Sequence, residues 1–191
     1  PSFWYGFESH QSLHLVYNVN MYNFQKQNST QTLQEGLEEF YSINTEFREL
    51  SEKTDNPNAK IFKEHDYTHV LFGLGTSIEE ESLLDSFVIW GTKFNVKQVF
   101  NFYKDPEYSA VISKIISKYG GWWSIAKIYL SLLPLKFKIF LRCMKMKKRW
   151  NYHDIPQDVL NTSLKDLRSE YNIDILHYKE VPVGRYLADN N

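Results

Sequence analysis

The fold is decided by residues 60–90, which read KIFKEHDYTHVLFGLGTSIEEESLLDSFVIW. Helix-forming residues run to position 72, where Gly73-Leu74-Gly75 interrupts them. Both Thr76-x-x-Glu79 and Ser77-x-x-Glu80 then have the form of a capping box, in which a hydroxyl and a later acid satisfy the first backbone N–H groups of a helix. The stretch therefore predicts a helix over 60–72 and a second helix from 76 or 77 to about 102, joined as a helical hairpin over 60–102.

The chain on both sides of this hairpin also has helical periodicity. Apolar residues recur three and four positions apart over 32–50, and further helices are predicted over 105–119, 122–133, 135–150 and 156–171, with a break near Pro134. Residues 1–31 predict an irregular N-terminal segment. We therefore expect an all-α fold, in which residues 1–191 form a single helical domain of about seven helices.

Composition and charge exclude several classes of protein. The single cysteine, Cys143, rules out an internal disulfide and a cysteine-rich zinc cluster. A net charge of −1 gives no reason to expect a nucleic-acid partner. The opening residues do not predict a signal peptide, and no stretch has the roughly 20 nearly uncharged apolar residues of a spanning helix. We therefore expect an intracellular protein that does not cross a membrane.

The first helix of the hairpin carries a metal-binding motif. His65 and His69 are four residues apart, and a helix that turns about 100° per residue places their imidazoles about 40° apart, where one ion can bind both. Asp66 is either a further ligand or the carboxylate that orients an imidazole N–H. The turn should bring Glu81 to nearly the same height as His69. We predict one divalent ion held by His65, Asp66, His69 and Glu81.

The predicted ligands restrict the metal and the chemistry. Two imidazoles with one or two carboxylates suit zinc, the ion we expect, and also iron or manganese, with magnesium acceptable when water completes its shell. The chain has no nucleophile-elbow pattern and no phosphate-binding glycine loop. His153 with Asp154 is interpreted as a loop pair before Pro156, and His177 as a structural residue.

The pattern His65-Asp66-x-x-His69, eleven residues and then Glu81 resembles the signature of the ubiquinone (coenzyme Q) biosynthesis protein 4 family. A weaker continuation runs from Trp150 through Ser163-Leu164-Lys165-Asp166-Leu167-Arg168 to Tyr171-Asn172-Ile173, so the resemblance covers about residues 60–175. It implies an α-helical fold, a metal near an apolar prenyl-lipid site, peripheral membrane association and partnership with other quinone-biosynthesis proteins. In that family the motif has been tied to complex assembly and to oxidative decarboxylation at C1 of a polyprenylated benzoate ring.

Three functional hypotheses follow. The first is an enzyme in which the metal polarises the carboxylate, or an adjacent oxygen, of a prenylated quinone precursor and assists loss of the carboxyl group. The second is a non-catalytic scaffold that binds an isoprenoid lipid within a quinone-biosynthesis complex. The third is an HD-type metal phosphohydrolase, which would need His14 and Asp154 and would leave His69 and Glu81 without a role.

The expected location follows from the resemblance. It implies the surface of the mitochondrial inner membrane in a eukaryote, or the cytoplasmic side of the membrane in a bacterium. A homodimer stays an open alternative.

A prenyl chain would need an elongated apolar cavity that leads to the metal. The candidate lining residues are large apolar side chains of the hairpin and of 122–133: Phe72, Leu84, Phe87, Val88, Trp90, Trp122 and Trp123. The alternative is that these side chains fill the core completely.

A basic amphipathic helix is predicted over 135–150. Its apolar residues alternate with cations that could reach lipid phosphates at a membrane surface, namely Lys136, Lys138, Arg142, Lys145, Lys147, Lys148 and Arg149. The alternatives are a solvated helix that packs on the core and a docking surface for an acidic partner protein.

Overall fold

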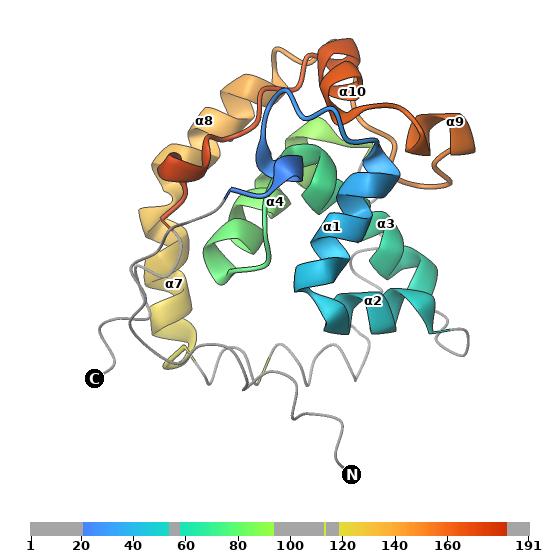
Figure 1. Ribbon diagram of the computed structural model, residues 1–191. Coiled ribbons are helices and arrows are strands. Elements are labelled where there is room, and N and C mark those ends of the chain that lie inside the picture. Colours follow the sequence, from blue (N-terminus) through green and yellow to red (C-terminus); the bar gives the residue numbers. More distant parts are fainter. Residues whose placement is uncertain (1–20, 54–57, 94–112, 114–118, 183–191) are drawn as a thin grey trace.

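Helices account for all the regular secondary structure in residues 21–53, 58–93, 113 and 119–182, the parts of the chain that the computed structural model describes. Two isolated bridges, Thr32–Ser163 and Thr92–Trp150, are the β pairing found there. The α-helices are α1 (Leu33–Ile43), α2 (Thr45–Glu52), α3 (Ala59–Phe72), α4 (Ile78–Gly91), α7 (Trp122–Ser131), α8 (Leu133–Cys143), α9 (Gln157–Leu160) and α10 (Leu164–Tyr171), with 3-10 turns η2 (Asn23–Gln25) and η3 (Tyr178–Glu180) (Figure 1). The expectation of a single all-α domain is confirmed.

Parts of the prediction lie outside the described residues. These parts are most of the irregular N-terminal segment, the chain beyond position 93 at the end of the hairpin, and nearly all of the helix over 105–119. His14, which the phosphohydrolase hypothesis requires, also lies there. The prediction that the second helix of the hairpin runs to about 102 is wrong, because α4 ends at Gly91 and Thr92 is extended. Among the described helices, none combines the length and the apolar character needed to cross a membrane.

The turn between α3 and α4 forms where the sequence predicts it. Gly73 ends α3 in the left-handed conformation, with φ of +67°, and its N–H donates to the carbonyl of Val70. Ser77 begins α4: its hydroxyl accepts from the N–H of Glu80, and the Glu80 carboxylate accepts from the N–H of Ser77. Of the two predicted capping boxes, the one at Ser77 is therefore used.

The predicted helix over 32–50 is two helices. The backbone of Asn44, with φ of −130° and ψ of 66°, separates α1 from α2, and its side-chain amide donates to the carbonyl of Phe40. An asparagine side chain that satisfies a helix-end carbonyl favours termination over continuation. Apolar periodicity continues across the break, so it could not show where the helix ends.

The predicted helix over 135–150 is wrong in its C-terminal half, because α8 ends at Cys143. Trp150 is buried, and its backbone N–H donates to the carbonyl of Gly91 while its carbonyl accepts from Lys93. These two contacts with the end of α4 hold Trp150 beside that helix. The break at Pro134 is confirmed, since α7 and α8 meet at Leu132 and follow one another along one side of the molecule (Figure 1).

The core is apolar and lies between α1, α3, α4, α8 and α10. At its centre the buried guanidinium of Arg168 donates to the carbonyls of Leu71 and Val70 at the end of α3, and to those of Phe24 and Lys26 beside η2. The last carbonyls of a helix lack partners within it, so a cation there is favourable. Burial lowers the pKa of Arg168 to about 9.

Candidate metal centre

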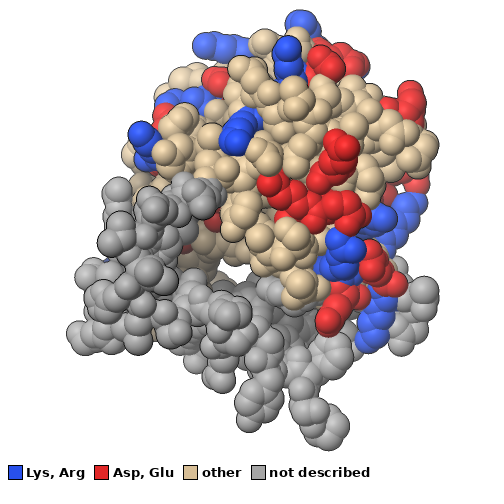
Figure 2. All heavy atoms as spheres, viewed as in Figure 1, with Lys and Arg blue, Asp and Glu red and all other residues tan. Residues whose placement is uncertain are grey.

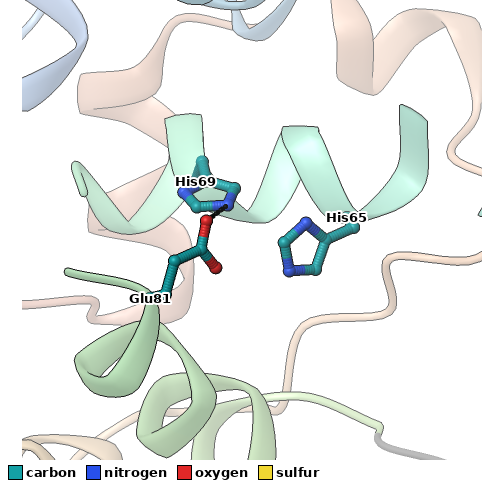
Figure 3. Close-up of side chains that lie close together, drawn as sticks. All are labelled: His65, His69 and Glu81. Atoms are coloured by element: carbon teal, nitrogen blue, oxygen red, sulfur yellow. Dashed lines mark ion pairs between the residues drawn. The ribbon is translucent and has the colours of Figure 1, made fainter. Parts of the chain in front are cut away.

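Three of the four predicted ligands come together at the start of α4. His65 and His69 project from one face of α3, and Glu81 projects toward them from the first turn of α4 (Figure 3). One possible ligand atom from each residue lies within 4.8 Å of those of the other two. The distances are short enough for side-chain adjustment to bring all three onto one ion.

His69 is arranged as a metal ligand would be. The ring is fully buried, and Nδ1 lies 3.2 Å from the carbonyl oxygen of Leu74. A carbonyl only accepts, so Nδ1 carries a hydrogen and, in the neutral ring, Nε2 carries the lone pair. Nε2 is buried without a hydrogen-bond partner, although Glu81 Oε1 is 3.4 Å away. This is the ring orientation that backbone carbonyls impose on metal-binding histidines.

The charges of His69 and Glu81 are coupled. Burial lowers the pKa of His69, but the nearby Glu81 carboxylate, with smaller effects from Asp66 and the Leu74 carbonyl, raises it to about 9. Burial raises the pKa of Glu81, whereas His69 and His65 lower it, and the net direction is downward. In the metal-free protein the pair is therefore charged. A divalent ion would compete with the His69 proton for the Nε2 lone pair.

The site is open to solvent on one side. The His65 side chain is 42% exposed and that of Glu81 is 34% exposed, whereas His69 is sealed behind them. The His65 ring meets the His69 ring edge to face, with centroids 4.7 Å apart. A ligand could therefore reach an ion from the side of His65 and Glu81.

Asp66 does not join the three ligands. Its side chain is buried, and Oδ2 accepts a hydrogen bond of 2.9 Å from the hydroxyl of Tyr41, which also contacts Ser51. Burial and the Asp66 charge raise the pKa of Tyr41. Asp66 Oδ1 lies 3.9 Å from His65 Nδ1, which is too far for a hydrogen bond, so Asp66 has neither of its two predicted roles in this structure.

The predicted lipid-binding residues divide into two groups. Phe72, Leu84 and Phe87 are at most 1% exposed, and the rings of Phe72 and Phe87 stack with centroids 4.6 Å apart. These three residues fill the core, as the alternative interpretation expected, and cannot line an open cavity. Val88 is half-buried, whereas the indoles of Trp90, Trp122 and Trp123 are exposed.

A pocket of about 290 Å³ lies on the face of α3 that points away from the two ligand histidines. It contains none of the predicted lipid-binding residues; its walls are Lys60, Lys63, Glu64, Tyr67, Asp154, Ile155 and Leu160.

Nearby, buried Glu64 accepts a 2.7 Å hydrogen bond from His153 Nδ1. The sequence predicts only a loop pair at His153 and Asp154. It does not show the contact with Glu64, because 89 positions separate the two partners. Asp154 pairs with Lys60 and not with the metal centre, which removes support for the phosphohydrolase.

Several cations of the predicted membrane surface are engaged by acids of the C-terminal segment. Lys138 pairs with Glu180, Arg142 with Asp174 at 3.1 Å, and Lys148 with Glu170 at 2.5 Å. Lys147 donates to the carbonyl of Ser169, Lys136 lies over the ring of Tyr129, and Lys145 and Arg149 are exposed. On the face shown in Figure 2, cations and acids are interspersed and do not form one basic patch. Three of the seven cations of the expected membrane surface are thus neutralised by acids within the molecule.

The fold and the site together define an all-α protein with two histidines and one glutamate grouped on adjacent helices. No family model matches the chain, and no curated protein or solved structure matches it significantly. The chemistry of the site therefore has to be inferred from its own residues.

Proposed function

We propose that the chain binds one divalent metal ion through His65, His69 and Glu81. The observation that carries this proposal is the buried Nε2 of His69, which has no hydrogen-bond partner and faces Glu81 while Nδ1 is held by Leu74. In the metal-free chain a proton on Nε2 faces the Glu81 carboxylate, and removal of that proton would leave a buried lone pair that needs another partner. A divalent ion would satisfy it and the Glu81 carboxylate together.

The donor set favours particular metals. Two imidazoles and one carboxylate suit zinc, and they also suit iron and manganese. When bound, such an ion would polarise a carboxylate or a neighbouring oxygen of a ligand. His69 would hold the ion from the sealed side, and the partly exposed His65 and Glu81 would border the ligand.

We further propose that the ligand is a prenylated benzoate of isoprenoid-quinone synthesis, and that the reaction is oxidative decarboxylation at C1 of its ring. The bond from C1 to the carboxyl group would break with release of CO2, a hydroxyl from O2 would take its place, and an external two-electron donor would reduce the second oxygen atom to water. Support comes from the resemblance of the motif over 65–81 to the ubiquinone biosynthesis protein 4 family, together with the open side of the site. A ring carboxylate is the kind of group that a metal with three protein ligands can accept.

A non-catalytic scaffold that binds an isoprenoid lipid is the second candidate. It is favoured by a row of exposed apolar side chains three and four residues apart along α7 and α8, which are Leu130, Leu133, Phe137, Leu141 and Met144. Exposed apolar rows of this kind mark contacts with lipid or with a partner. On this hypothesis lipid binding would survive loss of the metal, whereas on the enzymatic one turnover would stop.

Metal binding is tested by dialysing the full chain against Zn²⁺, Fe²⁺ or Mn²⁺ and measuring bound metal by mass spectrometry. We expect one equivalent in the wild-type chain and almost none in His69→Ala. His177→Ala removes an exposed imidazole elsewhere and should keep the full equivalent. Stoichiometric metal in the double variant His65→Ala/His69→Ala would overturn the ligand assignment.

The ligand class is tested by binding 4-hydroxy-3-geranylbenzoate and its methyl ester to the metal-loaded and metal-free chain. We expect the free acid to bind the loaded chain more tightly than the ester does, because the ester lacks the carboxylate charge. Equal binding of both compounds with and without metal would instead favour the scaffold.

A further inference from the structure

Asp85 lies on α4 one helical turn after Glu81. Residues four apart on a helix are surface neighbours on the same face, so Asp85 borders the side of the metal centre that Glu81 occupies. The Asp85 side chain is exposed, and it makes no hydrogen bond or ion pair with another residue in the described part of the chain. Its carboxylate is therefore free to rotate.

Asp85 is electrostatically coupled to the whole metal centre. Burial and the Glu81 charge raise the pKa of Asp85 to about 6, while His65, Lys136 and His69 oppose that shift. The geometric basis for placing Asp85 beside the metal centre is its position one turn after Glu81 on α4.

Lys136 lies on α8, which packs against α4. Burial lowers the pKa of its ammonium group, and Asp85 partly reverses this effect. The side chain is half-buried, and Nζ lies 4.2 Å from the centre of the Tyr129 ring. Its positive charge favours the ionised form of Asp85, so Lys136 is the cation with which a divalent ion would compete.

We propose that Asp85 supplies a second carboxylate ligand to the divalent ion. Asp66, which the sequence predicts as a possible further ligand, instead accepts a hydrogen bond from the hydroxyl of Tyr41. Asp85 lies outside the group of atoms within 4.8 Å, so it has to rotate toward the ion, and its exposure leaves room for this. The indication that an ion binds here is the buried Nε2 of His69, which has no hydrogen-bond partner and lies 3.4 Å from Glu81 Oε1. The inference rests on the proposed metal site.

Two variants give opposite predictions. Asp85→Asn removes a ligand charge at nearly constant volume and should weaken metal binding at least tenfold. Lys136→Met removes the competing cation and keeps an apolar side chain beside Tyr129, so it should strengthen binding. Asp158→Asn, on α9, is the matched control, because its exposed carboxylate lies on another helix, and it should change nothing.

The probe is Co²⁺, titrated into the metal-free full chain and followed by visible absorption. The d–d bands report the number and type of ligands, so Asp85→Asn should change their position or intensity as well as the Kd. Far-UV circular dichroism of each variant confirms that it is folded.

The outcomes separate the two proposals. If the wild-type chain binds no Co²⁺, the metal site itself is wrong. If it binds and Asp85→Asn leaves both Kd and spectrum unchanged, the site stands and the Asp85 assignment is overturned. A weaker Kd with an unchanged spectrum also overturns it, because Asp85 would then act through its charge alone.

Discussion

At the scale of single residues, His69 connects protonation to metal binding. Its Nδ1 is committed to the Leu74 carbonyl, so Nε2 can hold either a proton or an ion. The Glu81 carboxylate, opposed by burial, raises the pKa of His69 from 6.5 to about 9. The protonated ring therefore stabilises the metal-free fold fully below pH 6.5, and this contribution is lost as the pH rises through about 9.

Metal affinity should have the opposite pH dependence. Because the ion displaces the His69 proton, we expect the affinity for Zn²⁺ to rise about tenfold per pH unit from pH 6.5 and to level off near pH 9. Competition with a chromophoric chelator measures the affinity, and calorimetry in two buffers of different ionisation enthalpy counts the released proton. An affinity that is constant between pH 6.5 and 9 would show that His69 is not protonated in the metal-free chain.

At the scale of elements, the turn between α3 and α4 sets the register of the metal centre. Gly73 adopts a φ of +67°, and a Cβ there would lie 2.8 Å from the Cδ1 of Ile175. Leu74, the next residue, supplies the carbonyl that orients His69. The backbone of this turn therefore positions both a ligand histidine and the start of the helix that carries Glu81.

Gly73→Ala should lower both stability and metal affinity. The left-handed conformation costs a residue with a Cβ about 1–2 kcal/mol, and relief of the contact with Ile175 would shift the turn. Urea unfolding measures the first effect and Co²⁺ titration the second. Gly121→Ala is the control, because Gly121 also has a positive φ, of +90°, but a Cβ there meets nothing within 4 Å. Loss of stability in both variants with loss of metal affinity only in Gly73→Ala is the expected result.

At the scale of the whole molecule, Arg168 joins segments that are distant in the sequence. Its guanidinium binds the end of α3 and the residues around η2, which lie up to 144 positions away. These hydrogen bonds satisfy buried carbonyls of both segments, and those of Val70 and Lys26 accept from Gly73 and Ser29 as well. The same guanidinium therefore holds the C-terminal end of α3, just before the turn that leads to Glu81.

Arg168→Lys should destabilise the fold although it keeps the charge. A lysine cannot reproduce the planar set of donors, and each buried carbonyl left unpaired costs about 1–3 kcal/mol. We expect a loss of at least about 2 kcal/mol in urea unfolding. Arg149→Lys, at an exposed position, should lie within about 0.5 kcal/mol of the wild type. Equal stability of the two variants would contradict the structural role assigned to Arg168.

The sequence by itself determined the features that depend on neighbouring residues. Gly73 and Ser77 predicted the ends of α3 and α4, and the four-residue spacing of His65 and His69 predicted one shared helix face. Each of these depends on hydrogen bonds or side-chain neighbours within about one helical turn. The resemblance over 65–81 likewise depends only on the spacing of residues along the chain.

Only the tertiary structure decided which groups meet across the fold. Asp66 binds Tyr41, 25 positions away, Trp150 lies beside Gly91, and Arg168 binds carbonyls of two distant segments. The side chains of Phe72 and Phe87 could have lined a cavity or filled the core, and their packing against each other selected the core. Spacing along a helix shows which face a residue occupies, whereas its partner depends on which distant segment packs against that face.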